Sequence, residues 1–270
     1  MKKIKVGIIG CGAIGTEIAK ACRGRLAASV ELVAICDISR QKAEKLLGSV
    51  GADISVMDVD GLVNASDVIV ESASAAVSAV ILEKCINNGK DCLVMSVGGL
   101  IGKEELLKRA AAKGIKVYIP SGAICGIDGL KSASVGRIES VVLTTRKPPK
   151  GLEGAPYLIE KGVDLGKIKK ETVLFEGSAQ EAVKGFPANV NVSAVLSLAG
   201  LGSAKTRVRI VTSPDYTKNT HEIEITGDCG KIMTRTDNVP SEVNPKTSAL
   251  AIFSAIATLE SLTTSVRIGT

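Results

Sequence analysis

The stretch VGIIGCGAIG, residues 6–15, decides the fold. Its glycines Gly10, Gly12 and Gly15 have the spacing G-x-G-x-x-G, directly after an apolar run and at the start of an Ala-rich segment. In dinucleotide-binding units the first glycine permits a tight turn, the second lets the backbone approach a pyrophosphate, and the third allows the helix to pack closely on the strand. The stretch therefore predicts a strand, a phosphate-binding turn and a helix.

The residues around this turn predict the other cofactor contacts. Ala13 and Ile14 open the expected helix, whose free N–H groups and partial positive charge favour phosphates. Asp37 ends the next apolar run, VELVAICD, at the distance expected of the carboxylate that binds the adenosine ribose. Arg40, three residues later, suits a 2′-phosphate instead, so both NAD and NADP remain open as the cofactor. The alternative, a tight turn followed by a solvated Asp37, does not account for the full strand–turn–helix–strand context.

Outward from the turn, aliphatic runs alternate with amphipathic segments of helix length as far as about residue 120, which is the pattern of repeated βαβ units. We expect strands at residues 4–9, 31–36, 54–57, 67–71, 91–96 and 116–119, with helices at 13–26, 40–47, 59–64, 75–87 and 103–113. Right-handed crossovers place such strands in one parallel sheet. The segments after the later strands, among them VESAS and MSVGGL, are small and rich in Gly or Ser, as ligand-binding edges of open α/β sheets require.

After Pro120 the pattern changes to longer and more polar strands. We expect these at residues 138–145, 172–175, 206–212, 221–226 and 231–236, with a hairpin turn at GDCG and helices near 179–184 and 192–201. A last helix, 245–262 with Asn244 as its N-cap, ends the pattern. The prediction is an α/β chain with a Rossmann domain at 1–122, an α+β substrate domain on a mainly antiparallel sheet at 123–244, and a helix at 245–270 that packs back on the first domain. With 270 residues, one large domain is the alternative.

Composition limits the classes of partner. The net charge of +6 is spread over the chain with no long basic block, which argues against nucleic acid and suits small anions. The seven cysteines form no CxxC pair and no zinc-like spacing, so we expect free thiols and no metal. The N-terminus passes from charges through a short apolar run into the glycine turn, which predicts neither a signal peptide nor a membrane span. A cytoplasmic location is expected.

His221 is the one histidine of the chain and stands in KNTHEIEITGDCG. A dehydrogenase needs a group that exchanges a proton near pH 7, which makes His221 a candidate catalytic residue, although a lone histidine can equally be structural and Lys or a tuned carboxylate can do the same task. Asn219 lies two residues before it, and Glu222 is placed to orient the ring. Arg146 and Lys147, in TTRKPPKG, are candidate cations for substrate carboxylates, or else part of a solvated basic loop stiffened by the prolines.

The chain resembles the L-aspartate dehydrogenases of archaea and bacteria along nearly all of its length. The segments that carry the resemblance follow in order: VGIIGCGAIG, VESAS, MSVGGL, PSGAICGIDGL, TTRKPP, FPANVNVSAVLSLAG, NTHEIEITGDCG and NPKTSALAIFSAIATL. The resemblance implies oxidation of L-aspartate to iminoaspartate with NAD or NADP, and hydrolysis of the imine to oxaloacetate and ammonia. It also implies that His221 is the active-site residue, that Ala123 and Asn189 contact the cofactor, that the product feeds NAD biosynthesis and that the enzyme is a homodimer.

Two other functions remain open from the sequence. One is a related two-domain dehydrogenase or reductase that acts on homoserine, a semialdehyde or a sugar. The other is an NAD(H)-sensing protein without turnover, for which the sequence offers no DNA-binding module or interaction tail. A panel of substrates separates these readings from the oxidation of aspartate.

Overall fold

The computed structural model describes residues 2–51, 53–187, 190–241 and 247–270. The chain divides into two compact units. The first comprises Met1–Pro120 and Ile252–Arg267, and the second comprises Ser121–Ala251 and Ile268–Thr270. Each unit is built on a sheet of its own and has its own apolar core.

The first unit contains a parallel sheet of six strands in the order β3-β2-β1-β4-β5-β6. The strands are β1 Ile4–Ile9, β2 Val30–Cys36, β3 Ser55–Val56, β4 Val68–Glu71, β5 Asp91–Val94 and β6 Val117–Tyr118. The predicted parallel Rossmann sheet is confirmed. Because the order reverses between β1 and β4, the ligand crevice of such a sheet lies outside the carboxyl ends of these two strands.

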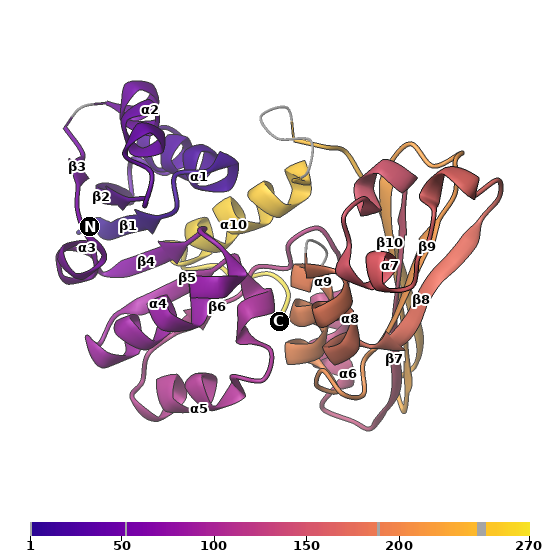
Figure 1. Cartoon of the computed structure of the whole chain (residues 1–270). Helices are drawn as coiled ribbons and strands as arrows, with labels where there is room; N and C mark the ends of the chain where they lie inside the picture. The colour runs from indigo at the N-terminus through magenta and orange to yellow at the C-terminus, as the bar shows by residue number, and fades with distance from the viewer. Residues whose placement is uncertain (1, 52, 188–189, 242–246) are drawn as a thin grey trace. The chain divides into compact units, whose positions relative to one another are not determined.

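The helices of the first unit lie on both faces of this sheet, α1 and α2 on one and α3 and α4 on the other (Figure 1). Their bounds are α1 Ala13–Arg23, α2 Arg40–Val50, α3 Val59–Ala65, α4 Ala75–Asn87 and α5 Glu104–Ala112, with a 3-10 turn, η1, at Val97–Leu100. The buried positions of α1 are Gly15, Ile18, Ala19 and Cys22, which is one helical stripe. Helix α10, Ala249–Ser261, adds Ala255 and Leu259 to the same core cluster. It begins four residues after the predicted start, and the predicted cap Asn244 lies outside the described residues.

The second unit contains a sheet of five strands in the order β11-β10-β7-β9-β8. Its strands are β7 Ile138–Lys147, β8 Thr172–Ser178, β9 Arg207–Thr212, β10 Asn219–Gly227 and β11 Gly230–Asn238. All neighbours are antiparallel except β7 and β9, which run parallel, so the expectation of a mainly antiparallel sheet is confirmed. The predicted hairpin at GDCG is also present, because Gly227 pairs with Gly230 at the end of the β10–β11 ladder.

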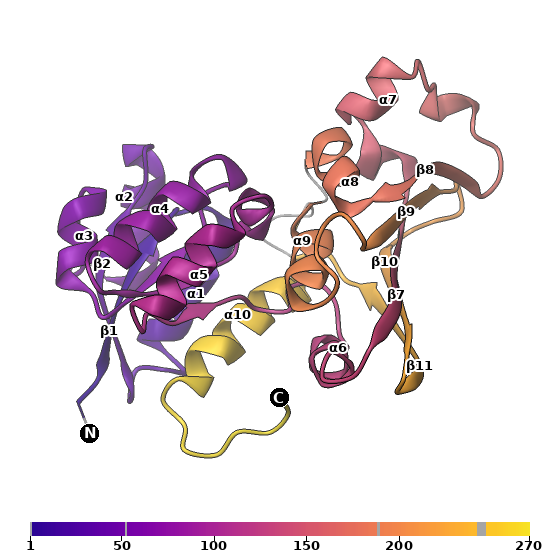
Figure 2. The ribbon, with the colours of Figure 1, turned by 90° about the horizontal axis from the view of Figure 1, so that it is seen from below.

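Helices cover one face of this second sheet (Figure 2). They are α6 Ile127–Ala133, α7 Pro156–Glu160, α8 Ala179–Gly185 and α9 Val190–Ala199, with 3-10 turns η2 Pro149–Leu152 and η3 Leu165–Lys167. Three rings pack together beneath them, with Phe175 centred 5.3 Å from Tyr157 and 5.5 Å from Phe186. A chain poor in aromatic residues thus places half of its six aromatic side chains in one cluster of the second core. In the described ranges, no helix is both long enough and apolar enough to cross a membrane.

Candidate active site

The glycine loop between β1 and α1 has three glycines for three different reasons. A Cβ on Gly10, whose φ is 101°, would lie 2.5 Å from the Ser72 carbonyl, and one on Gly15 would lie 1.9 Å from the Gly10 oxygen. A Cβ on Gly12 would meet nothing within 4 Å, and the φ of this residue is an ordinary −76°. Nothing in the protein therefore excludes a side chain at Gly12, and the space is open to a ligand. A pyrophosphate against the loop fits this gap.

Helix α1 begins directly after this gap. Gly12 is its N-cap and makes no side-chain cap, so Ala13 and Ile14 present the first turn of an uncapped helix of 11 residues. The N–H groups of such a turn have no partner within the helix and favour an anion. The loop and helix together can hold a cofactor diphosphate.

Asp37 is fixed toward the glycine loop by two backbone bonds. Its Oδ2 accepts from the Cys11 N–H at 2.7 Å and its Oδ1 from the Ser39 N–H at 2.7 Å. Each oxygen of an ionised carboxylate has a second lone pair, so the group can still accept the ribose hydroxyls. Arg40 donates to Glu44 at 2.8 Å and is highly exposed. The arrangement favours a ribose with free hydroxyls over a 2′-phosphate.

Glu71, at the carboxyl end of β4, is a residue of this site that the sequence analysis did not single out. It is fully buried, and its two oxygens accept from the Ala73 and Ser96 N–H groups, each at 2.9 Å. Burial raises the pKa of this carboxyl although the backbone bonds favour its charged form. Glu71 thereby joins the loops after β4 and β5 at the edge where open α/β sheets bind ligands. A carboxylate that ends the apolar run VIVE was the available signal.

His221 lies on β10 and is only 6% exposed. Its Nδ1 is 3.0 Å from the Thr145 Oγ1, and the two residues are direct partners in the β10–β7 ladder. Burial lowers the pKa of the imidazole to about 3, and the positive charge of Lys147 acts in the same direction. The ring is therefore neutral at physiological pH. Thr145, and not the expected Glu222, orients it.

Lys147 is the last residue of β7 and not part of a basic loop as one reading of the sequence expected. Burial lowers the pKa of its ammonium group to about 8. Gly151 lies against its side chain, since a Cβ there would be 3.7 Å from the Lys147 Cβ and Cδ and 3.9 Å from the Asn219 Oδ1. The structure thus brings together three of the predicted residues of the second unit: Asn219, His221 and Lys147.

Arg146 is not part of this group. Side chains alternate along a strand, so Arg146 faces the side of the sheet opposite to Thr145 and Lys147. There it forms an ion pair with Glu222, and its Nε lies 3.7 Å from a Glu171 oxygen. Glu222 also accepts from Arg235 at 3.1 Å. The structure accordingly separates Arg146 and Glu222 from the imidazole that the sequence analysis grouped with them.

The Ala123 carbonyl is tied to the strand next to His221. It accepts from the Thr236 Oγ1 at 3.1 Å and from the Asn238 Nδ2 at 3.0 Å. The same Thr236 hydroxyl lies 3.4 Å from the His221 carbonyl oxygen. Two residues that are 98 positions apart therefore share one hydroxyl partner. Asn189, the other predicted cofactor contact of this half, lies outside the described residues.

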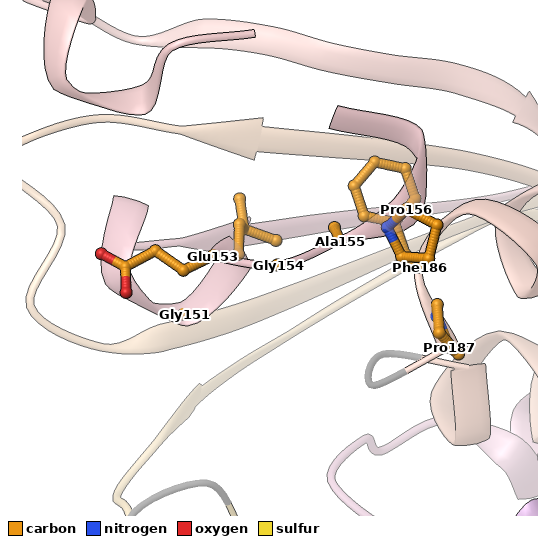
Figure 3. Close-up of a pocket in the computed structure, with 8 residues that line it drawn as sticks. Gly151, Glu153, Gly154, Ala155, Pro156, Phe186 and Pro187 are labelled. Carbon is orange, nitrogen blue, oxygen red and sulfur yellow. The ribbon is translucent and has the colours of Figure 1, made fainter. Parts of the chain in front are cut away.

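A small hollow of about 60 Å³ begins at Gly151, the residue that covers Lys147. Its lining is mostly apolar and comprises Gly151, Leu152, Glu153, Gly154, Ala155, Pro156, Phe186 and Pro187. In Figure 3 the Glu153 carboxylate lies at one end of this set and Phe186 and Pro187 at the other. The hollow has room for a few water molecules and is too small to hold a dinucleotide.

Comparisons with known proteins agree with both halves. Residues 10–120 match the family model described as homoserine dehydrogenase, NAD binding domain, and residues 128–262 match the one described as aspartate dehydrogenase, C-terminal. The L-aspartate dehydrogenase of Methanosarcina acetivorans is 48% identical over 99% of this chain and 100% of its own length. That of Methanococcus maripaludis strain C6 is 46% identical with the same coverage.

Solved structures give the same result. The aspartate dehydrogenase of Thermotoga maritima superposes with a TM-score of 0.76 at 26% identity, covering 99% of this chain and 100% of its own. A homoserine dehydrogenase of Thiobacillus denitrificans, with a TM-score of 0.64 at 15% identity over 97% of this chain and 74% of its own, shares the fold. The parallel sheet, the glycine loop and these matches define an NAD(P)-dependent oxidoreductase. Within that class, the chain belongs to the L-aspartate dehydrogenase family.

Proposed function

We propose that this chain oxidises L-aspartate with NAD or NADP. L-Aspartate, water and NAD(P)⁺ give oxaloacetate, ammonium, NAD(P)H and one proton, through iminoaspartate. The observation that carries the proposal is the cluster of Thr145, Lys147 and His221 on one sheet face, in a chain that matches L-aspartate dehydrogenases from end to end. The cluster supplies a neutral imidazole and a lysine of lowered pKa, and the oxidation of an ammonium substrate requires such polar groups beside the reacting nitrogen.

The residues of the first unit fit the cofactor. The gap at Gly12 and the first turn of α1 at Ala13 would hold the diphosphate, and Asp37 would hold the adenosine ribose. When bound, the cofactor accepts the hydride that leaves the aspartate Cα. Ala123 and Asn189 are proposed as its contacts in the second unit.

The residues of the second unit are proposed to act on the substrate. His221, neutral at working pH, faces the reacting nitrogen or the water that hydrolyses the imine, and Thr145 fixes its orientation. Asn219, beside Lys147, offers an amide to a substrate carboxylate. Arg146 was predicted as a second cation for these carboxylates, but its place on the opposite face and its pairing with Glu222 favour a structural role.

The cellular setting is part of the proposal. Iminoaspartate is a precursor of the nicotinamide ring, so we propose a place in NAD biosynthesis. All seven cysteines are free thiols, which supports a reducing, cytoplasmic compartment. The resemblance supports a homodimer, and light scattering of the purified protein, with a mass of two chains expected, checks it.

The test is a substrate panel followed at 340 nm. The purified chain is mixed with NAD⁺ or NADP⁺ and with L-aspartate, D-aspartate, L-glutamate or L-homoserine. We expect reduced cofactor with L-aspartate alone, with oxaloacetate and ammonium formed in equal amounts. Turnover of homoserine in place of aspartate would transfer the function to the homoserine-type dehydrogenases, and cofactor binding without turnover of any substrate would favour the sensing protein.

A further inference from the structure

The group that takes the substrate proton can be assigned from the second sheet. Thr145 and Lys147 are two residues apart on β7, and side chains two apart in a strand share a face. His221, opposite Thr145 on β10, is held on that face by its 3.0 Å contact with the Thr145 hydroxyl. Lys147 is therefore one pleat further along the strand from the residue that holds the imidazole.

Lys147 is held firmly at this place. Its carbonyl accepts from the Thr212 Oγ1 at 2.7 Å, which fixes the end of β7 to β9. Its aliphatic stem lies under Gly151, where even one added carbon would be in van der Waals contact with it. The stem is thereby covered on this side, and Lys147 as a whole is partly buried.

Burial lowers the pKa values of both titratable groups of the cluster, and only one of the two groups remains an effective base near neutral pH. Burial and the neighbouring charge bring the pKa of His221 to about 3, which makes it a weak base. Burial brings the pKa of Lys147 to about 8, so a part of the side chain is an unprotonated amine near neutral pH. A general base is most effective when its pKa lies near the operating pH.

We propose that Lys147 is the proton acceptor for the substrate ammonium, and that His221 beside it acts as a neutral hydrogen-bond partner. The unprotonated Lys147 amine takes a proton from the ammonium, and the N–H electron pair stays on the substrate nitrogen. That pair forms the C=N bond as the Cα hydrogen leaves with its two electrons to NAD(P)⁺. The products are the protonated imine, NAD(P)H and the Lys147 ammonium, which returns its proton to water. This inference rests on the proposed function.

The groups that face Lys147 support such a role. Among the described residues, its neighbours include His221 and Asn219 of β10 and the uncharged Thr212 of β9 and Gly151 of η2. Its neighbour on the same strand, Arg146, lies on the opposite face with Glu222. Burial is the cause of the lowered pKa of Lys147.

Lys147→Arg tests the proposal, because arginine keeps the positive charge but does not lose its proton at working pH. We expect kcat to fall about 100-fold or more, as for loss of a general base, while KM for L-aspartate changes by about threefold or less. The alkaline rise of kcat in the wild type, centred near pH 8, should disappear. The matched control is Lys231→Arg, at an exposed ion pair with Glu224, for which no change is expected. A Lys147→Arg enzyme with wild-type kcat and pH profile would overturn the proposal.

Chemical rescue of Lys147→Ala gives a second measurement that does not depend on how arginine fits. Methylamine, which can accept a proton, should restore activity in proportion to its free-base concentration, and tetramethylammonium, which has only the charge, should not. Equal rescue by both compounds would mean that Lys147 contributes only a positive charge, which would contradict its role as proton acceptor. NADH fluorescence and thermal melting show that the variant is folded.

The wild-type enzyme distinguishes failure of the proposed function from failure of this inference. If the wild type does not turn over L-aspartate, the proposed function is wrong. If both the wild type and Lys147→Arg are active, only the assignment of Lys147 as proton acceptor is wrong.

Discussion

The glycine loop of the first unit and the histidine cluster of the second are built in different ways. The loop consists of consecutive residues, and its binding groups are backbone N–H groups and a gap where Gly12 has no side chain. The cluster joins side chains that are 76 residues apart, Thr145 and His221, through the register of two strands. One region is made by spacing along the chain, and the other is made by strand pairing.

This difference determines how each region fails. A backbone site depends on conformation and free space, so it is sensitive to an added carbon and indifferent to most side-chain chemistry. A side-chain site depends on the ionisation and orientation of particular groups, so it fails when one functional group is exchanged at constant shape. Substitutions of each kind should therefore separate cofactor binding from turnover.

His221→Asn should have the largest effect and should break the second region alone. We expect kcat/KM for L-aspartate to fall about 1,000-fold, or about 4 kcal/mol of activation free energy, because the buried group beside the reacting nitrogen is lost. The affinity for NADH, measured by fluorescence titration, should stay within about twofold. A parallel loss of NADH affinity would mean that the two regions are not separable in this way.

A pair of glycine substitutions should break the first region in two distinct ways. Gly15→Ala places a carbon 1.9 Å from the Gly10 oxygen, so we expect a loss of about 3 kcal/mol in the free energy of unfolding. Gly12→Ala meets no protein atom within 4 Å, so stability should change by less than about 0.5 kcal/mol while NAD(H) affinity falls about tenfold or more. Urea denaturation and NADH titration of both variants check the pair. Unchanged affinity in Gly12→Ala would remove the assignment of the diphosphate to this gap.

The same difference explains how much could be predicted from the sequence. The local spacing of the sequence predicts the glycine loop and Asp37. The periodicity of apolar residues predicts the parallel sheet and the face of α1 that packs on it. The partner of His221 could not be found in this way, because it depends on the register of β7 with β10 and the neighbouring Glu222 was the local candidate. The role of Glu71 could not be predicted either, because its two bonds form only where the loops after β4 and β5 meet at one edge of the folded sheet.

The sequence also did not predict that Arg146 and Lys147 lie on opposite faces of the sheet. The prolines at 148 and 149 suggested a loop that includes both cations, whereas β7 continues to Lys147 and alternation sends the two side chains to opposite faces. Alternation assigns a residue to one face only if the residue lies within the strand, so the position of the strand end matters. Strand ends are the part of the pattern that local composition determines least.

The neutral state of His221 should make the second region sensitive to acid. The folded pKa of about 3 lies below the ordinary value of 6.5, so the stabilisation is complete above pH 6.5 and is lost as the pH falls toward 3. The slope is up to about 1.4 kcal/mol per pH unit. We expect the free energy of unfolding of the wild type, relative to His221→Asn, to decrease by about 2 kcal/mol between pH 7 and pH 5 in urea denaturation. A difference independent of pH would show that the imidazole is not buried as a neutral ring.

Arg146→Gln should have the smallest effect on activity. It tests directly whether the face of the second sheet that carries His221, and not the opposite face, binds the substrate. Arg146 and Lys147 are adjacent in sequence and were equal candidates for the substrate carboxylates, but Arg146 pairs with Glu222 on the face away from His221. We expect KM for L-aspartate within about twofold of the wild type, and a stability loss of about 1 kcal/mol from the broken ion pair, which is partly exposed. Steady-state kinetics at saturating cofactor measure the first value and thermal melting the second. A KM raised tenfold or more would place the substrate on the Arg146 face, and the strand register that unites Thr145, Lys147 and His221 would then no longer define the active site.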